Sequence, residues 1–218
     1  MNSLKMLGTA LVAGLALVSA SAVQAAPIIS NPSFTVGAFT FDTFNVSVTS
    51  NGNAAPIANS AVNVDLIPGG SGVQFSSGFT TLNGGFSDAA ITYVAHGTAG
   101  LTSVGLSFDG YFMGQAIAAV TETIFADAAR TVLAGQARVS CGVVGGCTLS
   151  DVVTLTGSYD TLYITKDINV TSFTGGLAQT SIINQTFTPV AVPEPMSLAL
   201  FGSGLLGLGL VRRARKSS

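Results

Sequence analysis

Apolar and polar residues alternate along much of residues 39–187, and no other feature of the sequence restricts the fold as strongly. Residues 162–170 show the pattern most fully, with four aliphatic side chains and Lys166 at even positions and polar or tyrosine side chains at odd ones. A period of two residues is typical of β-strands with one buried face. Glycine-rich turns, such as residues 83–85, separate the alternating segments. The sequence therefore predicts an all-β domain, folded as an antiparallel, jelly-roll-like β-sandwich.

Residues 115–134 are the segment whose secondary structure the pattern leaves open. They lack glycine and proline, and Ile117, Val120 and Ile124 could form one stripe of a helix. Residues 120–125 also alternate between apolar and polar side chains, as a strand would. We predict two strands joined by a turn at residues 127–130, with a helix as the alternative.

Residues 1–25 have the three parts of a secretory signal peptide. Lys5 provides a positive charge, residues 6–18 are apolar, and Val23 and Ala25 occupy the −3 and −1 positions of a cleavage site after Ala25. The apolar run is shorter than the roughly 20 residues that a membrane-spanning helix needs. We therefore predict export and removal of this segment, in preference to a retained N-terminal anchor.

Residues 192–218 combine a proline motif, an uncharged apolar run and a basic end. A helix over residues 196–211 would be about 24 Å long, which is short for a hydrocarbon core of about 30 Å. Basic residues beside a membrane span remain in the cytoplasm, so the preceding domain would lie outside. This predicts a marginal transmembrane helix. The basic residues behind it act as a cytoplasmic stop, because they prevent the helix from passing through the membrane. The stop residues are Arg212, Arg213, Arg215 and Lys216.

Pro193, Glu194 and Pro195 precede the apolar run directly. Each proline fixes φ, lacks an N–H group and disfavours helix in the residue before it. The motif is therefore expected to be extended and accessible at the membrane face, in a form that a processing enzyme can bind.

This order of motif, span and basic end resembles the PEP-CTERM sorting signal of Gram-negative bacteria. Such tails are recognised by exosortases, which are integral-membrane cysteine proteases or transpeptidases, and the family is associated with exopolysaccharide and biofilm. The resemblance implies an exosortase as partner, a transient inner-membrane anchor, cleavage near residues 193–196, and a final location at the cell surface or in the extracellular matrix. Residues 151–187 are also similar to the membrane-proximal part of other PEP-CTERM proteins. Neither resemblance implies a chemical activity for residues 26–191.

The charge of residues 26–191 argues against a nucleic-acid partner. This segment contains three basic and nine acidic residues, a net charge of −6, and the basic residues are scattered. Proteins that bind nucleic acid need a basic stripe or patch that follows the phosphates.

Cys141 and Cys147 are the two cysteines of the chain, and a glycine-rich segment separates them. In an exported protein this pair predicts a disulfide bond. Zinc would need further ligands, while the single histidine is remote in sequence. The spacing also differs from the C-x-x-C motif of redox enzymes. We predict no metal and no cofactor.

His96 is the candidate general base. No Gly-x-Ser-x-Gly motif surrounds a serine of residues 26–191, so we expect a solvent-facing histidine at a strand end. Asp160, Asp167 and Asn169 could contribute oxygen ligands to Ca²⁺, but their spacing matches no calcium loop. The sequence therefore nominates no catalytic residue.

These observations favour an exported, non-catalytic surface or matrix protein that is associated with exopolysaccharide. One alternative is a carbohydrate-binding module, which would need exposed aromatic side chains, although the chain contains no tryptophan. The other is a secreted hydrolase, which would need a concave pocket with converging titratable groups.

Overall fold

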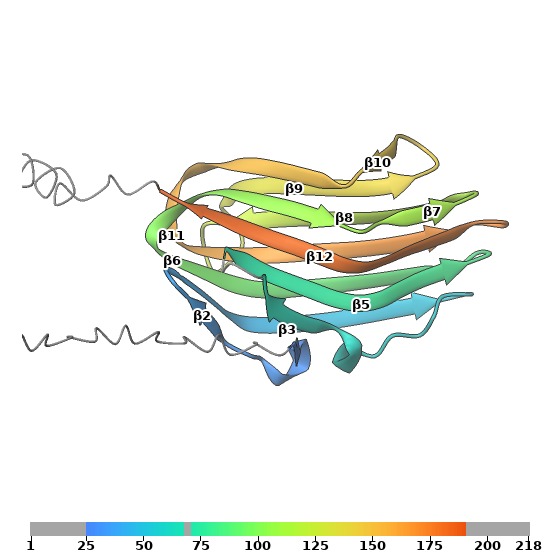
Figure 1. The fold of residues 1–218 in the computed structure, drawn as a ribbon, viewed down its shortest axis with the longest axis horizontal. Helices are drawn as coiled ribbons and strands as arrows, with labels where there is room; N and C mark the ends of the chain where they lie inside the picture. Colours follow the sequence, from blue (N-terminus) through green and yellow to red (C-terminus); the bar gives the residue numbers. More distant parts are fainter. Residues whose placement is uncertain (1–24, 68–70, 191–218) are drawn as a thin grey trace, which may run out of the picture.

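The computed structural model describes residues 25–67 and 71–190, and this part of the chain is almost entirely β-structure (Figure 1). Its strands form a 12-stranded hydrogen-bonded sheet in which all pairs are antiparallel. The predicted all-β antiparallel fold is confirmed. The strands are β1 (Ala26–Pro27), β2 (Phe34–Val36), β3 (Phe39–Asn51), β4 (Asn63–Leu66), β5 (Gly72–Leu82), β6 (Phe86–Phe108), β7 (Tyr111–Met113), β8 (Ala116–Phe125), β9 (Leu133–Gly142), β10 (Gly146–Thr148), β11 (Ser150–Ser172) and β12 (Leu177–Pro189).

Strands β6 and β11 carry the sheet from one layer of the domain into a second. They are 23 residues long each, and they pair with each other along most of their length. The first half of β6 lies between β3 and β11, whereas the second half, from Leu101, lies between β11 and β12. Both strands bend at the left of Figure 1, so that the sheet folds back on itself.

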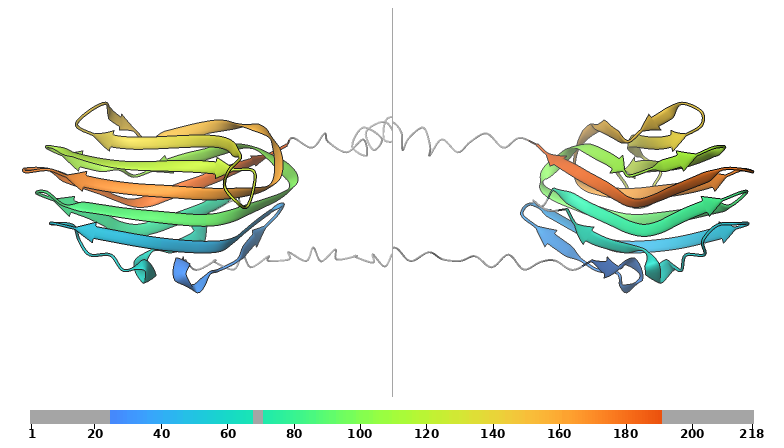
Figure 2. Two further views of the ribbon diagram at one scale, coloured as in Figure 1. Left: turned by 180° about the vertical axis from the view of Figure 1, so that it is seen from behind. Right: turned by 45° about the vertical axis from the view of Figure 1, so that its right-hand side comes forward.

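Glycines permit this bend in β6. Gly100 has a φ of +76°, a conformation that favours glycine, and the side chain of Leu101 occupies the place of a Cβ atom at Gly97. The register of β11 also shifts between Thr154 and Thr161, where it passes the bend. One layer therefore contains β3, β8 and β9 with half of β6 and β11, and the other contains β4, β5 and β12 with the remaining halves (Figure 2).

The core lies between the two layers and is rich in aromatic side chains. Phe41 of β3 contacts Phe187 of β12, with ring centroids 5.3 Å apart. Tyr93 of β6 packs in the same way against Phe75 of β5, at 5.4 Å, and also stacks on Phe44 at 5.4 Å. Inward-facing side chains of both layers thus interdigitate, as in packed β-sheets generally.

Residues 115–134 form strands, as predicted, and not a helix. Strand β8 ends at Phe125 and β9 begins at Leu133. The turn between them is held by Asp127, whose carboxylate accepts hydrogen bonds from the backbone N–H groups of Thr131 and Val132. The alternation of side chains was the more informative signal here, because both strands bury one face against the second layer.

Other predictions concern segments beyond the described residues. The predicted signal peptide and the sorting segment, with its motif, helix and basic residues, lie outside them, apart from Ala25 at the predicted cleavage site. The described ranges include only short 3₁₀ helices, Ile28–Ser30 and Asn59–Ala61, and no helix there could cross a membrane.

Candidate functional site

Two loops gather at the end of the domain that lies opposite to Pro189, on the right of Figure 1. The backbone N–H of Phe173 donates to the carbonyl oxygen of Gln115 at 2.8 Å. The backbone N–H of Val143 donates to the carbonyl oxygen of Ala116 at 3.1 Å. Because Gln115 and Ala116 are adjacent, these two hydrogen bonds hold the β9–β10 and β11–β12 loops beside the start of β8.

Large apolar side chains are exposed on these loops and on β7. Their exposed fractions lie between 47% and 84%, whereas the inward-facing apolar side chains of β8 and β9 are almost completely buried. Exposed apolar groups that lie together are typical of surfaces that contact a partner. We call these four side chains the distal tip: Met113, Val143, Val144 and Phe173.

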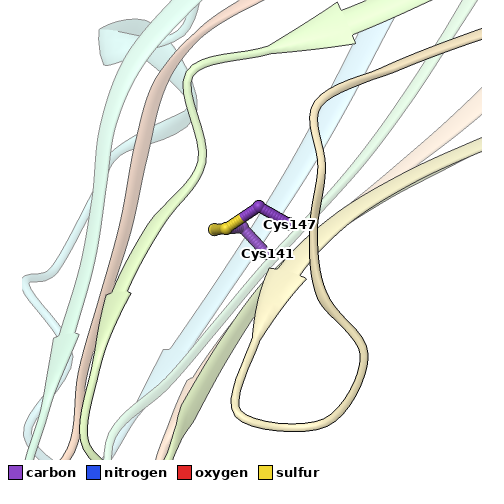
Figure 3. The surroundings of a disulfide bond; sticks show 2 residues. All are labelled: Cys141 and Cys147. Atoms are coloured by element: carbon purple, nitrogen blue, oxygen red, sulfur yellow. A yellow bond between two sulfur atoms is a disulfide. The ribbon is translucent and has the colours of Figure 1, made fainter.

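A disulfide bond closes the loop that carries two of these side chains (Figure 3). Cys141 of β9 and Cys147 of β10 are directly paired across the two strands, with Cα atoms 3.9 Å apart. Gly145 and Gly146 complete the turn with φ values of +86° and +69°, which glycine adopts without steric strain. The predicted disulfide is confirmed, and it restricts the loop on which Val144 is the most exposed large apolar residue.

His96 lies on the outer face of β6, where the structure brings it together with two polar side chains. Its Nδ1 atom is 3.1 Å from Oγ1 of Thr161, and its Nε2 atom is 3.6 Å from Oδ2 of Asp42. A histidine with a carboxylate and a hydroxyl has the parts of a general base. However, the imidazole is 42% exposed, and it does not line either of two shallow surface cavities of about 120 and 170 Å³.

The structure does not bring the candidate calcium ligands together. Asp167 and Asn169 lie on the outer face of β11, whereas Asp160 belongs to its irregular segment near the bend. Within residues 25–67 and 71–190, no three histidine, cysteine, aspartate or glutamate side chains lie close enough to hold a metal ion.

Asp167 instead forms a pair with Asp88, which sequence reasoning missed. Burial, a hydrogen bond shared with Asp167 and the negative charge of Asp167 raise the pKa of Asp88 to about 6. Two carboxyl groups that share a site retain a proton more readily than either would alone. The pair therefore binds a proton in mildly acidic solution, below about pH 6. Asp88 and Asp167 could not be paired from the sequence, because their contact depends on the register of β6 and β11.

A second cluster lies in the core, between the two layers. Lys166 of β11 and Glu122 of β8 form an ion pair, and both side chains are fully buried. Nζ of Lys166 also donates a hydrogen bond of 2.8 Å to Oε1 of Gln185, which lies on β12 in the facing layer. The amide of Gln185 donates in turn to the carbonyl oxygen of Gly105 at 3.0 Å.

The surroundings of this cluster are apolar and aromatic. Nζ of Lys166 is 5.5 Å from the ring centroid of Phe75. Burial lowers the pKa of Lys166 and raises the pKa of Glu122, and the attraction between the two groups offsets this only in part. The pKa of Tyr93 also rises, because this residue is buried and lies near Glu122. Oε1 of Glu122 has no hydrogen-bond partner among the described residues.

The sequence contained a signal for this cluster. Lys166 occupies the same face of its strand as Leu162, Ile164 and Ile168, and Glu122 lies in the apolar row of residues 116–124. A charged residue in an apolar row indicates a buried polar partner. The identity of that partner could not be predicted, because the residues come from three separate strands.

Comparison with solved structures found weak similarities. One is to the carbohydrate-binding module TmCBM61 in complex with beta-1,4-galactotriose, with 11% identity over 67% of this chain and 89% of that chain, and a TM-score of 0.37. Another is to the enzymatically active domain of tailspike protein 4 of bacteriophage CBA120, with 15% identity over 66% of this chain and 19% of that chain, and a TM-score of 0.32. A third is to carbohydrate-binding modules of the beta-sandwich superfamily, with 15% identity over 79% of this chain and 64% of that chain, and a TM-score of 0.31. Similarities at this level carry no information about function.

Comparison with curated proteins found no match. A family model, described as the PEP-CTERM protein-sorting motif, matches residues 191–216. The match begins two residues after the end of β12 at Pro189 and includes the predicted proline motif and basic residues. The resemblance that the sequence suggested is thus confirmed, and the chain carries a PEP-CTERM protein-sorting motif directly behind its β-domain.

Proposed function

We propose that this chain is an exported protein that an exosortase sorts to the cell surface or to the extracellular matrix. The observation that carries this proposal is the PEP-CTERM motif at residues 191–216, immediately behind the last strand of the folded domain. Removal or transfer of a sorting motif in this position would leave the described strands in place, because β12, the last of them, ends at Pro189.

The proposal includes three segments. Residues 1–25 are a signal peptide that is cleaved after Ala25, residues 26–191 are the exported domain, with a jelly-roll-like sandwich as its finer architecture, and residues 192–218 are the sorting segment. The apolar run holds the precursor in the inner membrane, and the basic residues from Arg212 to Lys216 remain in the cytoplasm. The domain is then exposed to the outside, where its disulfide bond is stable.

We further propose that the domain is non-catalytic and acts by contact. Two observations support this part. The histidine that could serve as a base, His96, is exposed on an open strand face and lines neither shallow cavity. The distal tip, by contrast, exposes apolar side chains on β7 and on two loops, one of which the disulfide bond closes, at the end of the domain opposite to Pro189.

Intact and tryptic masses of the protein from its native cells test the sorting. Membrane and medium fractions are measured separately. We expect a mature form that ends near residues 193–196, and a Glu194→Ala variant that retains Ser218. Pro189→Ala, which changes a proline outside the motif, serves as the matched control and should be processed normally. A membrane form that still ends at Ser218, in cells with an active exosortase, would contradict the proposal.

A second candidate function is direct binding of a matrix polysaccharide. It is favoured by two aromatic side chains, Tyr111 and Phe173, which are 47% and 60% exposed. Exposed rings stack on the apolar faces of sugars and so provide contact area. Co-sedimentation with exopolysaccharide should fall for Phe173→Ala and remain unchanged for Val152→Ala, which removes an apolar side chain that is 70% exposed elsewhere on the domain. Equal co-sedimentation of both variants and the unmodified protein would exclude a role for Phe173.

A further inference from the structure

We propose that the buried side chains of Lys166 and Gln185 become covalently joined by an amide bond between Nζ and Cδ, with Glu122 as the group that transfers protons. The three side chains come from β11, β12 and β8 and meet in the core. Nζ lies in contact with the acceptor oxygens of both partners, at 2.8 Å from Oε1 of Gln185. The bond would be an internal cross-link between the two layers.

The geometry places a nucleophile beside an oriented carbonyl group. The amide nitrogen of Gln185 is fixed by its hydrogen bond to the carbonyl oxygen of Gly105, which leaves Oε1 directed at Nζ of Lys166. Well-oriented groups that are held together can reach effective concentrations of about 10⁵ M. All three side chains are fully buried, so water does not compete as a nucleophile.

Lysine must lose a proton before it can attack. Burial favours the neutral forms of both Lys166 and Glu122, because it lowers the pKa of the amine and raises the pKa of the carboxyl group. Transfer of one proton from Nζ to the adjacent Glu122 carboxylate gives a neutral amine and a carboxylic acid. A desolvated lysine of this kind is an activated nucleophile.

The reaction requires no cofactor and no oxidant. The lone pair of Nζ forms a bond to Cδ of Gln185, and Glu122 gives its proton to Oε1. The Glu122 carboxylate then takes a proton from Nζ and delivers it to the amide nitrogen of Gln185. The bond between Cδ and that nitrogen breaks, ammonia leaves, and Glu122 recovers its proton as the carbonyl group reforms. Lysine amine and glutamine amide thus become a secondary amide and ammonia.

Glu122 is assigned the proton transfer because of its free oxygen. One carboxylate oxygen contacts Nζ of Lys166, while the other has no hydrogen-bond partner among the described residues. Such a group can accept and donate protons in turn. Direct condensation of Lys166 with Glu122 would release water instead of ammonia, so the two reactions differ in product mass.

The test is a high-resolution mass measurement on the folded mature protein, after denaturation and reduction. We expect a mass that is lower than the sequence mass by one ammonia. Trypsin should no longer cleave after Lys166, because an acylated lysine is not a substrate, and the fragment that begins at Val139 should contain the link to Gln185. This localisation is needed because a succinimide at Asn51 or Asn83 also releases ammonia.

Variants identify the role of each group. Lys166→Arg and Glu122→Gln should both restore the full sequence mass, and Glu122→Gln should leave the lysine cleavable. Gln74→Leu is the matched control, since this glutamine bonds to Asn184 on the same strand as Gln185; it should retain the loss of ammonia. The unmodified protein tests the proposal without any variant. Full sequence mass and normal cleavage after Lys166 in the folded protein would overturn the proposal. A mass that is lower by one water would also overturn it.

Discussion

Asp109 accepts two hydrogen bonds from Ser181, one from its backbone N–H at 2.8 Å and one from its hydroxyl at 2.6 Å. The same carboxylate accepts from Thr180 Oγ1 at 2.8 Å and from the N–H of Ile182 at 2.9 Å. The register of β12 against β5 shifts at this point, so that one side chain at the end of β6 supplies acceptors for the irregular part of β12.

Replacement of Asp109 by alanine should therefore destabilise the domain. Loss of a charged acceptor leaves several donors without partners, and the expected decrease in the free energy of unfolding is about 1–3 kcal/mol. Urea denaturation at pH 7 measures this decrease. Asp160→Ala, at an exposed aspartate of β11, is the control and should change stability little. Equal stability of the two variants would contradict this account of β12.

The contribution of Asp109 should also depend on pH. Burial acts to raise the pKa of this carboxyl group, but the hydrogen bonds from Ile182, Ser181 and Thr180 outweigh it, and the pKa is lowered. A lowered pKa in the folded state gives stability that is present above the unfolded value of 3.8 and is lost as the pH falls through the folded pKa. The difference between unmodified protein and Asp109→Asn should therefore shrink in acid, as thermal denaturation at several pH values can measure.

Asp88 should show the opposite dependence. Its pKa is raised to about 6 in the folded protein, from an ordinary value of 3.8. The folded state then binds more protons than the unfolded state between these values, so this group makes folding less favourable as the pH rises through them. Asp88→Asn should raise the melting temperature at pH 8 and change it little below pH 3.8. A variant that is less stable than the unmodified protein at pH 8 would show that Asp167 is not a repulsive neighbour.

Removal of the disulfide should affect the distal tip more than the core. Cys141→Ser with Cys147→Ser opens a short loop, for which the chain-entropy model gives about 2 kcal/mol. Hydrogen exchange should become faster at Val143 and Val144, while the amides of β6 and β11 retain their relative order of protection. Unchanged exchange in the loop would mean that the hydrogen bond from Val143 to Ala116 alone fixes its position.

The buried pair should be non-additive. In the protein before the amide bond of Lys166 forms, Lys166→Met leaves a buried carboxyl group without its cation, and Glu122→Met leaves a buried amine without its anion; each should cost about 3–5 kcal/mol. The double variant places two apolar side chains in an apolar core and should be more stable than either single variant. Chemical denaturation of the three variants completes the cycle. Additive losses would mean that the two side chains do not interact energetically.

The sequence predicted local structure better than it predicted contacts. Apolar side chains alternate along the sequence around Tyr93 and again around Leu106, and the structure joins these two segments in one strand, β6. They could not be joined from the pattern, because the bend between Gly97 and Leu101 interrupts the alternation as the strand passes into the second layer. The disulfide was predictable because its cysteines are close in sequence.

The polar contacts were beyond prediction for a related reason. Asp109 meets Ser181, Asp88 meets Asp167 and Lys166 meets Gln185 only through the register of strands that are far apart in sequence. In each case the sequence shows the charged or polar residue, and for Lys166 the apolar row also indicates that the side chain points inward. The partner, however, depends on how β6, β11 and β12 are aligned. Register follows from the packing of the whole core, and no local pattern encodes it.

Under the proposed function the protein is held at its C-terminal end and bound at the distal tip, and strand β12 then has a mechanical consequence. It runs from the loop near the distal tip to Pro189, with β5 and β6 hydrogen-bonded on its two sides. A pull from the C-terminal end therefore acts along the strand, at right angles to its hydrogen bonds. These hydrogen bonds are then loaded in shear, so many of them must break at the same time. The domain should therefore resist tension better than a sheet whose hydrogen bonds break one after another.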